Sequence, residues 1–206
     1  MSIRIKTYPY GPLGSNMYAL ISEDSYIIVD PSVSPDRVEL SGSPEAIFIT
    51  HGHYDHFAAL HEWTRMYPET PVIIHSLDKM RLSTPSENCS AAFGMPYSAD
   101  VSAIDAESVS GKAFLGGLVT LEVIHTPGHS EGEVLYIFSE EGERHMFSGD
   151  MLFRGSIGRD DLPGGDTAKM RASIELIKGL KGDYLIYPGH GPASRLSIER
   201  QYNPFF

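Results

Sequence analysis

Apolar residues alternate or run together in short segments along most of the chain, and this pattern predicts many β-strands. Residues 3–6 alternate between apolar and charged side chains, while residues 17–22 and 26–30 are mostly apolar. Two such runs joined by a short polar connection are typical of an antiparallel hairpin. Further apolar runs predict strands at residues 45–50, 71–75, 101–104, 113–115, 118–125, 134–138, 145–148 and 184–187.

Two segments instead carry apolar residues at helical spacing. The first extends from residue 55 to 66 and is followed by Pro68; the second, residues 166–179, begins with the capping residue Asp166. The stretch 77–100 has a weaker pattern, which predicts helical or irregular segments. Shorter helices are expected at residues 35–40 and 193–200.

Several predicted strands end in side chains that can bind a metal ion. The strand at 45–50 leads into Thr50-His51-Gly52-His53-Tyr54-Asp55-His56, which holds three histidines and an aspartate. Imidazole nitrogens and carboxylate oxygens suit divalent zinc, iron or manganese. His51 and His53 are two positions apart and can point the same way from an extended strand end. This motif therefore predicts a metal site.

Three later strand ends each add one candidate ligand: His129 in T-P-G-H-S, Asp150 in S-G-D, and His190 in P-G-H-G-P. A carboxylate can bridge two cations through its two oxygens. If these strand ends share one edge of the fold, there are enough ligands for two ions. The seven candidates are His51, His53, Asp55, His56, His129, Asp150 and His190.

The remaining histidines and the cysteine lie outside these motifs. Cys89 is in a polar stretch away from every motif, and we expect it to be structural. His125 is close enough in sequence to His129 to contact a ligand residue. Packing or surface positions are expected for His61, His75, His125 and His145.

Composition limits the classes of protein that fit. With 206 residues and 41% hydrophobic content, the chain suits one large domain better than two small ones. A net charge of −11 argues against a nucleic-acid partner or an anionic membrane surface. No apolar stretch is long enough to span a membrane, the N-terminus has no signal-like segment, and a single cysteine fits a reducing compartment. We expect a cytoplasmic monomer or homodimer that acts on a small molecule.

The motifs T-H-G-H-Y-D-H, H-T-P-G-H-S, S-G-D and Y-P-G-H-G-P, in this order, resemble the metallo-β-lactamase-fold hydrolase superfamily. Within it, G-S-I-G-R-D-D-L-P-G-G-D and the final N-P-F resemble glyoxalase II-like proteins, the hydroxyacylglutathione hydrolases. The resemblance spans essentially all of residues 1–206. It implies an α+β fold, a single-domain αββα sandwich with its site at one edge of the sheets.

The resemblance also implies an assignment of the ligands. Asp150 bridges two metals; His51, His53 and His129 hold one of them, and Asp55, His56 and His190 hold the other.

The activity implied by the resemblance is hydrolysis of a small-molecule thioester. The enzyme would use two divalent metal ions, for which zinc is the first choice and iron or manganese are the alternatives. Such ions provide hydroxide near neutral pH and stabilise the developing oxyanion. Asp55 is expected to orient the nucleophile as well as bind metal. Phe153, Arg154 and Arg159 are candidate substrate contacts.

The resemblance is closest to the short bacterial form of these enzymes. Eukaryotic-type glyoxalase II proteins continue into a C-terminal helical domain that contacts glutathione, whereas this chain stops at Phe206. We therefore expect the hydrolytic apparatus without that helical domain, which leaves the thiol half of the substrate open.

Other functions are compatible with the same fold. A persulfide dioxygenase would use one iron, held by His51, His129 and Asp150, and R-G-S-I-G-R resembles that family too. Against it, His190 is present and favours a second metal site. The glyoxalase-like segment disfavours a lactamase, and the complete ligand set disfavours a non-catalytic metal-binding protein.

Overall fold

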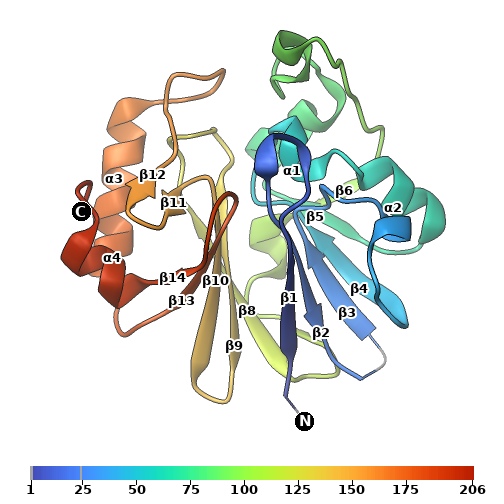
Figure 1. Cartoon of the computed structure of the whole chain (residues 1–206), viewed down its shortest axis with the longest axis horizontal. Helices are drawn as coiled ribbons and strands as arrows, with labels where there is room; N and C mark the ends of the chain where they lie inside the picture. The colour runs from blue at the N-terminus through green and yellow to red at the C-terminus, as the bar shows by residue number, and fades with distance from the viewer. Residues whose placement is uncertain (1, 24) are drawn as a thin grey trace.

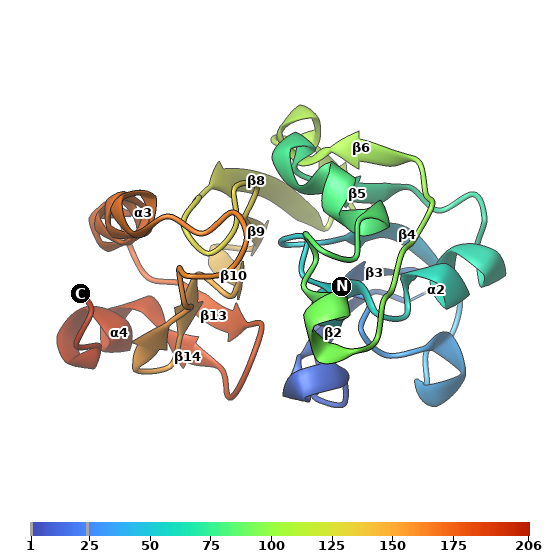
Figure 2. The same cartoon turned by 90° about the horizontal axis from the view of Figure 1, so that it is seen from above.

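Two six-stranded β-sheets pack face to face in this computed structural model, which describes residues 2–23 and 25–206. Figures 1 and 2 show the sheets as the two inner layers, with α1 and α2 outside one sheet and α3 and α4 outside the other. The predicted αββα sandwich is confirmed. The α-helices are α1 (Tyr54–Phe57), α2 (Leu60–Met66), α3 (Thr167–Gly179) and α4 (Leu196–Tyr202).

The first sheet follows the order of the chain. Its first three strands are antiparallel, as the hairpin pattern predicted, and the remaining strands are added in parallel. Its strands are β1 (Arg4–Tyr8), β2 (Met17–Ile21), β3 (Ser25–Val29), β4 (Ser43–Phe48), β5 (Val72–Ile74) and β6 (Ala103–Asp105).

The second sheet is mostly antiparallel. Only β13 departs from this, because it pairs in parallel with β10 after the chain has crossed through α3. In spatial order its strands are β14 (Ser194–Arg195), β13 (Leu185–Pro188), β10 (Glu143–Gly149), β9 (Val134–Glu140), β8 (Val119–His125) and β7 (Ala113–Phe114).

Three apolar clusters hold the four layers together. The middle one lies between the sheets, where Phe48 makes edge-on contacts with Tyr136 and Phe138. On one side, fully buried Trp63 packs α2 against the first sheet and donates from Nε1 to Val33 O. On the other side, Met170 of α3 belongs to the cluster that covers the second sheet. Burial of apolar surface on both faces of each sheet explains why the strands read as nearly continuous apolar runs.

The single helix expected over residues 55–66 is divided in two, so that prediction was wrong in part. The hydroxyl of Ser15 donates to the carbonyl of Asp55, and the amide of Ala59 donates to the carbonyl of Pro31. These two tertiary bonds replace the helical bond between Asp55 and Ala59. The break leaves α1 as a short segment that carries two of the candidate ligands, Asp55 and His56.

Shorter elements also differ from the expectations. Residues 35–40 form only a 3₁₀ turn at Pro35–Arg37, and the stretch 77–100 contains two 3₁₀ helices, η3 (Ser76–Ser83) and η4 (Ser90–Phe93). A small hairpin of β11 (Leu152–Phe153) and β12 (Ser156–Ile157) was not predicted. Two further 3₁₀ helices are η1 (Pro12–Gly14) and η5 (Ala106–Val109).

Within the described ranges, none of the helices combines the length and the apolar character needed to cross a membrane.

Candidate metal centre

The structure brings all seven predicted ligands into one cluster. Their ligand atoms form three overlapping groups in which all atoms lie within 4.8 Å of one another. The outer two groups are the two ligand sets implied by the resemblance, and Asp150 belongs to the group between them. The groups are His51–His53–His129, His51–His56–Asp150 and Asp55–His56–His190.

The first four ligands are positioned by the turn that follows β4. Gly52 is required at this turn, because an added Cβ would lie 2.6 Å from Cβ of Arg81. The amide of Gly52 donates to the carboxylate of buried Asp78 at 2.7 Å. The chain then enters α1, which carries Asp55 and His56. A buried strand and a tightly packed turn therefore hold these ligands in place.

Asp150 lies between the two outer ligand groups. Its Oδ2 is 3.5 Å from His129 Nε2, and its Oδ1 is 3.2 Å from His56 Nε2. Gly149 precedes it with φ +50°, and Gly189 passes so closely that a Cβ there would clash with Asp150 Oδ1. Asp150 Oδ2 also lies 3.6 Å from His190 Nε2, so the carboxylate faces both outer ligand groups, as a bridging ligand does.

Hydrogen bonds outside the cluster determine which imidazole nitrogens face into it. His129 Nδ1 donates to the carbonyl of Arg159 at 2.7 Å, and His56 Nδ1 lies 2.9 Å from Asp30 Oδ2. Thr50 Oγ1 donates to Asp30 and can accept from His51 Nδ1 at 3.2 Å. With the proton on the outer nitrogen, each inner nitrogen presents a lone pair to the cluster.

Several inner atoms fit metal coordination better than hydrogen bonding. Among the described residues, no hydrogen-bond partner reaches the buried atoms His51 Nε2, His56 Nε2 and Asp150 Oδ1. His53 Nδ1 and His129 Nε2 face each other at 2.8 Å, close enough for one ion to contact both. An unpartnered buried polar group costs about 1–3 kcal/mol, which a coordinated metal would offset. The donor set is therefore suited to divalent metal ions.

The pKa shifts agree with this role for His51, His53 and Asp150 and oppose it for His56 and His190. Burial lowers the pKa of His51 and His53 well below the usual value, so both are neutral and able to coordinate. Burial opposes ionisation of Asp150, but the neighbouring imidazoles, His56 first, lower its pKa below the usual range. For His56 and His190, burial is outweighed by the neighbouring carboxylates, which raise the pKa, so a metal ion bound here would take the place of a proton on each ring.

Sequence analysis missed the buried acid that orients two of the ligands. Asp30 directly follows β3 with φ +55°. It accepts hydrogen bonds from the amide and the hydroxyl of Thr50, both at 2.8 Å, and its Oδ2 lies 2.9 Å from His56 Nδ1. It stands at the end of an apolar strand, as the ligands do. The strand-end pattern could therefore have identified it.

Two further buried acids had no local signal. Glu133 Oε1 accepts from the amide of Asp150 at 2.7 Å, and burial, followed by the charge of Asp150, raises the pKa of Glu133 well above its usual value. Asp78 joins the two halves of the cluster, because it accepts from Gly52 and also from Ser130 Oγ and the amide of Gly132.

A cavity of about 250 Å³ opens onto the cluster. It contains two of the three predicted substrate contacts: Phe153, whose ring centroid is 6.1 Å from that of His190, and Arg159; Arg154 is exposed and does not line it. The cavity is lined by Leu13, His53, Asp55, Cys89, Phe93, His129, Asp150, Phe153, Gly158, Arg159, Leu162 and His190.

Cys89, expected to be structural, lies far from the motifs in sequence but close to them in space. It is buried and lines the cavity beside the metal ligands. The amide of Tyr54 donates to the carbonyl of Asn88 at 3.0 Å, which brings this segment against α1. A long-range backbone contact of this kind leaves no trace in the local pattern.

The other histidines stay outside the ligand groups. His61 is exposed on α2, His75 and His125 stack with ring centroids 4.2 Å apart, and His145 Nδ1 lies 3.3 Å from Tyr187 Oη. These positions agree with the packing and surface roles expected for them.

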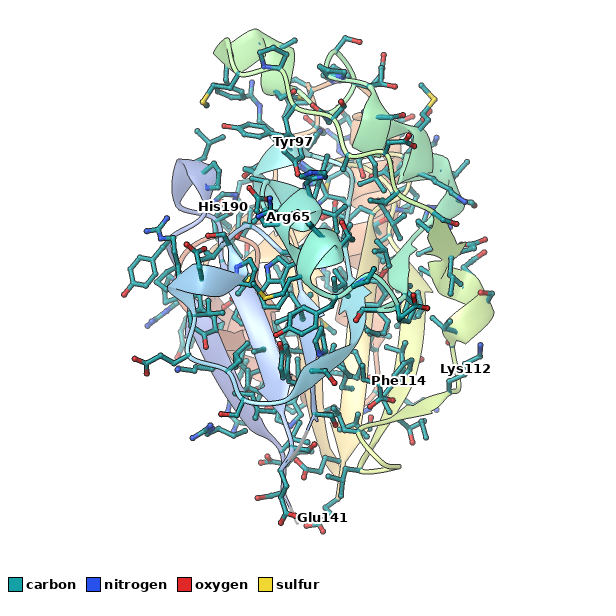
Figure 3. All side chains as sticks on the ribbon, turned by 90° about the vertical axis from the view of Figure 1, so that its right-hand side faces the viewer. Arg65, Tyr97, Lys112, Phe114, Glu141 and His190 are labelled. Carbon is teal, nitrogen blue, oxygen red and sulfur yellow. The ribbon has the colours of Figure 1, made fainter. Side chains whose placement is uncertain are left out.

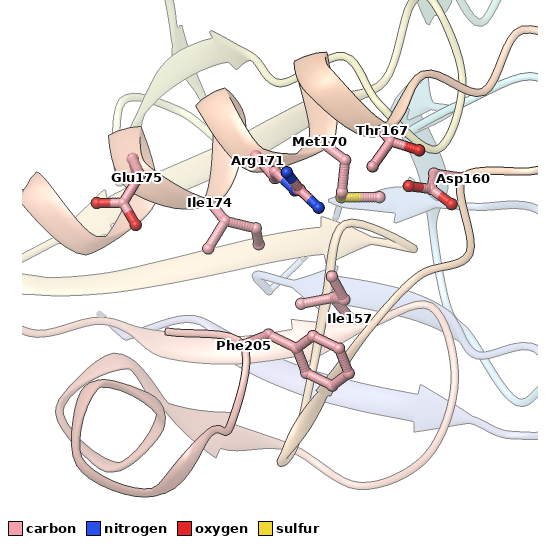
Figure 4. A pocket seen from close by; sticks show the side chains of 8 residues that line it. All are labelled: Ile157, Asp160, Thr167, Met170, Arg171, Ile174, Glu175 and Phe205. Atoms are coloured by element: carbon pink, nitrogen blue, oxygen red, sulfur yellow. The ribbon is translucent and has the colours of Figure 1, made fainter.

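A larger cavity of about 510 Å³ lies elsewhere, between α3, β12 and Phe205. Figure 4 shows its apolar wall of Met170, Ile174 and Ile157. None of the seven candidate ligands lines it. The smaller cavity is therefore the candidate active site.

Comparison with known proteins gives sequence relatives along nearly the whole chain. The family model described as the metallo-beta-lactamase superfamily matches residues 10–190. The chain is 37% identical over 205 residues to the probable metallo-hydrolase YqgX of Bacillus subtilis, covering 96% of this chain and 94% of that protein. It is 30% identical over 195 residues to the hydroxyacylglutathione hydrolase GloC of Haemophilus influenzae, covering 89% of this chain and 88% of that protein.

Solved structures also match nearly the whole chain. The crystal structure of the B3 metallo-beta-lactamase BLEG-1 matches with a TM-score of 0.85 and 33% identity, over 98% of this chain and 99% of that chain. TTHA1623 in a di-iron-bound form matches with a TM-score of 0.79 and 32% identity, over 98% of this chain and 100% of that chain. The ligand cluster, the sandwich fold and these matches together show that the chain belongs to the metallo-β-lactamase superfamily.

Proposed function

We propose that this protein is a binuclear metal-dependent hydrolase that cleaves thioesters, of the glyoxalase II type. The observation that carries the proposal is the position of Asp150, which directs one oxygen toward His56 and the other toward His129. A carboxylate placed between two ligand groups can bridge two bound ions. The likeness to the hydroxyacylglutathione hydrolase GloC supports a thioester as the substrate.

Different residues would hold the metal ions and orient the attacking water. Two divalent ions bound here would supply hydroxide near neutral pH and would stabilise negative charge on the substrate carbonyl oxygen. His51, His53 and His129 would hold one ion, and Asp55, His56 and His190 the other. Asp55 lines the cavity and has Oδ2 3.2 Å from His190 Nε2, so its carboxylate is placed to accept a hydrogen bond from the attacking water and orient it.

The donor set favours zinc. Its ligands are imidazole nitrogens and carboxylate oxygens, which zinc accepts in sites of this kind. The same atoms also suit iron and manganese, so metal availability decides between them. TTHA1623 has been solved in a di-iron-bound form, which makes iron the first alternative to test.

Elemental analysis and an assay of S-lactoylglutathione hydrolysis on the same sample test the proposal. We expect close to two metal ions per chain together with thiol release. Two ions without hydrolysis of any thioester would contradict the thioesterase. One iron per chain, with no hydrolysis but oxygen uptake on glutathione persulfide, would replace it by a mononuclear dioxygenase.

A further inference from the structure

The mouth of the metal cavity is formed largely by apolar side chains. Leu13 of η1 is 57% exposed and Phe93 of η4 is 50% exposed, although both border the cavity. Phe153 and Leu162 add partly buried apolar surface beside them. Large apolar side chains exposed together beside a cavity mark a surface that contacts a ligand.

The size of the cavity indicates that part of a thioester substrate would contact this rim. The cavity of about 250 Å³ is smaller than the ~300 Å³ at which pockets begin to enclose a drug-sized ligand. It can hold the reacting thioester group beside His190 and Asp55. The part of the substrate that extends beyond the reacting group would then lie across Leu13 and Phe93.

The rim offers little positive charge to an anionic thiol. Among the twelve described lining residues, Arg159 is the only lysine or arginine. Its guanidinium is engaged in a two-pronged ion pair, with Nε 2.6 Å from Asp161 Oδ1 and Nη2 2.8 Å from Asp161 Oδ2. The Arg159 guanidinium in turn lowers the pKa of Asp161, which keeps the pair ionised. The backbone of Arg159 is anchored to the metal ligand His129, so the pair stays beside the mouth.

We propose that the active site prefers thioesters of uncharged, apolar thiols to thioesters of anionic glutathione, because Asp161 pairs with the one arginine or lysine among the described lining residues and because Leu13 and Phe93 offer an apolar surface. This inference rests on the proposed thioesterase function and specifies its substrate class. The net charge of −11 acts in the same direction, since it disfavours the approach of an anion.

Two substrates with the same acyl group test the preference: the lactoyl thioesters of glutathione and of benzyl mercaptan, assayed with the metal-loaded protein. We expect kcat/KM to be higher for the benzyl thioester. Asp161→Asn should release Arg159 and lower KM for the glutathione thioester by about 3- to 5-fold, the size typical of one exposed ion pair, with kcat for the benzyl thioester unchanged. Phe93→Ser should raise KM for the benzyl thioester alone.

Glu175→Gln is the matched control. It removes an exposed carboxylate from a comparable ion pair, with Lys178 at 2.9 Å on α3, away from the mouth. A higher kcat/KM for the glutathione thioester in the unaltered protein, or equal effects of Asp161→Asn and Glu175→Gln, would overturn the preference. Absence of hydrolysis of both thioesters by protein with two ions bound would instead overturn the thioesterase itself, and this inference with it.

Discussion

Several residues of the metal centre are held in place by neighbours that are not themselves ligands. Asp30 and the carbonyl of Arg159 hold the outer nitrogens of His56 and His129, and Glu133 fixes the amide of Asp150. Such contacts orient a ligand before the ion arrives, which lowers the cost of assembling the site. Substitutions of single residues should therefore distinguish side chains that take part in catalysis from side chains that hold the metal ligands in place.

Asp55→Ala should abolish turnover and leave the fold intact. The side chain lies at the cavity, and the loss of a group that both binds metal and orients water should lower kcat by at least about 100-fold. Thiol release and the thermal midpoint measure the two effects. His61→Ala, an exposed change on α2, serves as the control. Activity retained by Asp55→Ala would exclude the proposed role.

Glu133→Ala should destabilise the protein and weaken metal binding, whereas Glu133→Gln should resemble the unaltered protein. The alanine leaves the buried amide of Asp150 without its acceptor, at a cost of about 1–3 kcal/mol. Because burial raises the pKa of Glu133 well above its usual value, glutamine mimics its neutral form. Urea unfolding and metal content test this pair, and identical values for both variants would contradict it.

At the element scale, short range patterns predict strands well and helix boundaries less well. The strands that deliver the ligands are apolar runs closed by Pro and Gly, so both their ends and their ligands were visible in the sequence. The break between α1 and α2 was not, because it comes from Ser15 and Pro31, which lie far from Asp55 and Ala59 in the chain. Glu133, Asp78 and Cys89 were missed for the same reason.

The stacked pair His75 and His125, which follow β5 and end β8, should make stability depend on pH. Burial, and next the charge of His125, lowers the pKa of His75 below its usual value. The unfolded chain therefore binds more protons near and below pH ~6.5, and the free energy of unfolding falls as the pH falls through that range.

The variant His75→Asn should show a smaller fall in stability between pH ~7.5 and ~5.5. Asparagine keeps a side-chain acceptor for the amide of Leu77, which His75 Nδ1 holds at 3.3 Å. Chemical denaturation with chelator present throughout removes the contribution of bound metal. His61→Asn is the control, and the same pH dependence in both variants would refute the role of the pair.

At the scale of the whole molecule, the metal centre joins the two sheets. His51 and His53 follow β4 of the first sheet, while His129, Asp150 and His190 follow strands β8, β10 and β13 of the second. The sequence alone could not give this strand order, since placing β13 between β10 and β14 depends on the path through α3. The resemblance to the superfamily implied the αββα sandwich and the site at one edge of the sheets, and no strand order.

Removal of metal should therefore lower global stability. A ligand that binds only the folded state at 100 times its Kd adds about 2.7 kcal/mol, and metal ions bound here would link candidate ligands from both sheets. We expect a chelator to lower the thermal midpoint and excess zinc to restore it. Asp150→Asn, which weakens the shared ligand, should reduce the shift. If a chelator left the thermal midpoint unchanged, the prediction that bound metal contributes to global stability would be wrong.

The hairpin between β9 and β10 lies at the end of the sandwich opposite His190, as Figure 3 shows with Glu141. Glu141 and Gly142 form its exposed tip, with φ +45° and +91°, a conformation typical of two-residue hairpin turns. A tip of this kind tolerates insertions. The hairpin is therefore a suitable site for attaching the protein to a bead or electrode. Attachment there would leave the metal cavity open to solution.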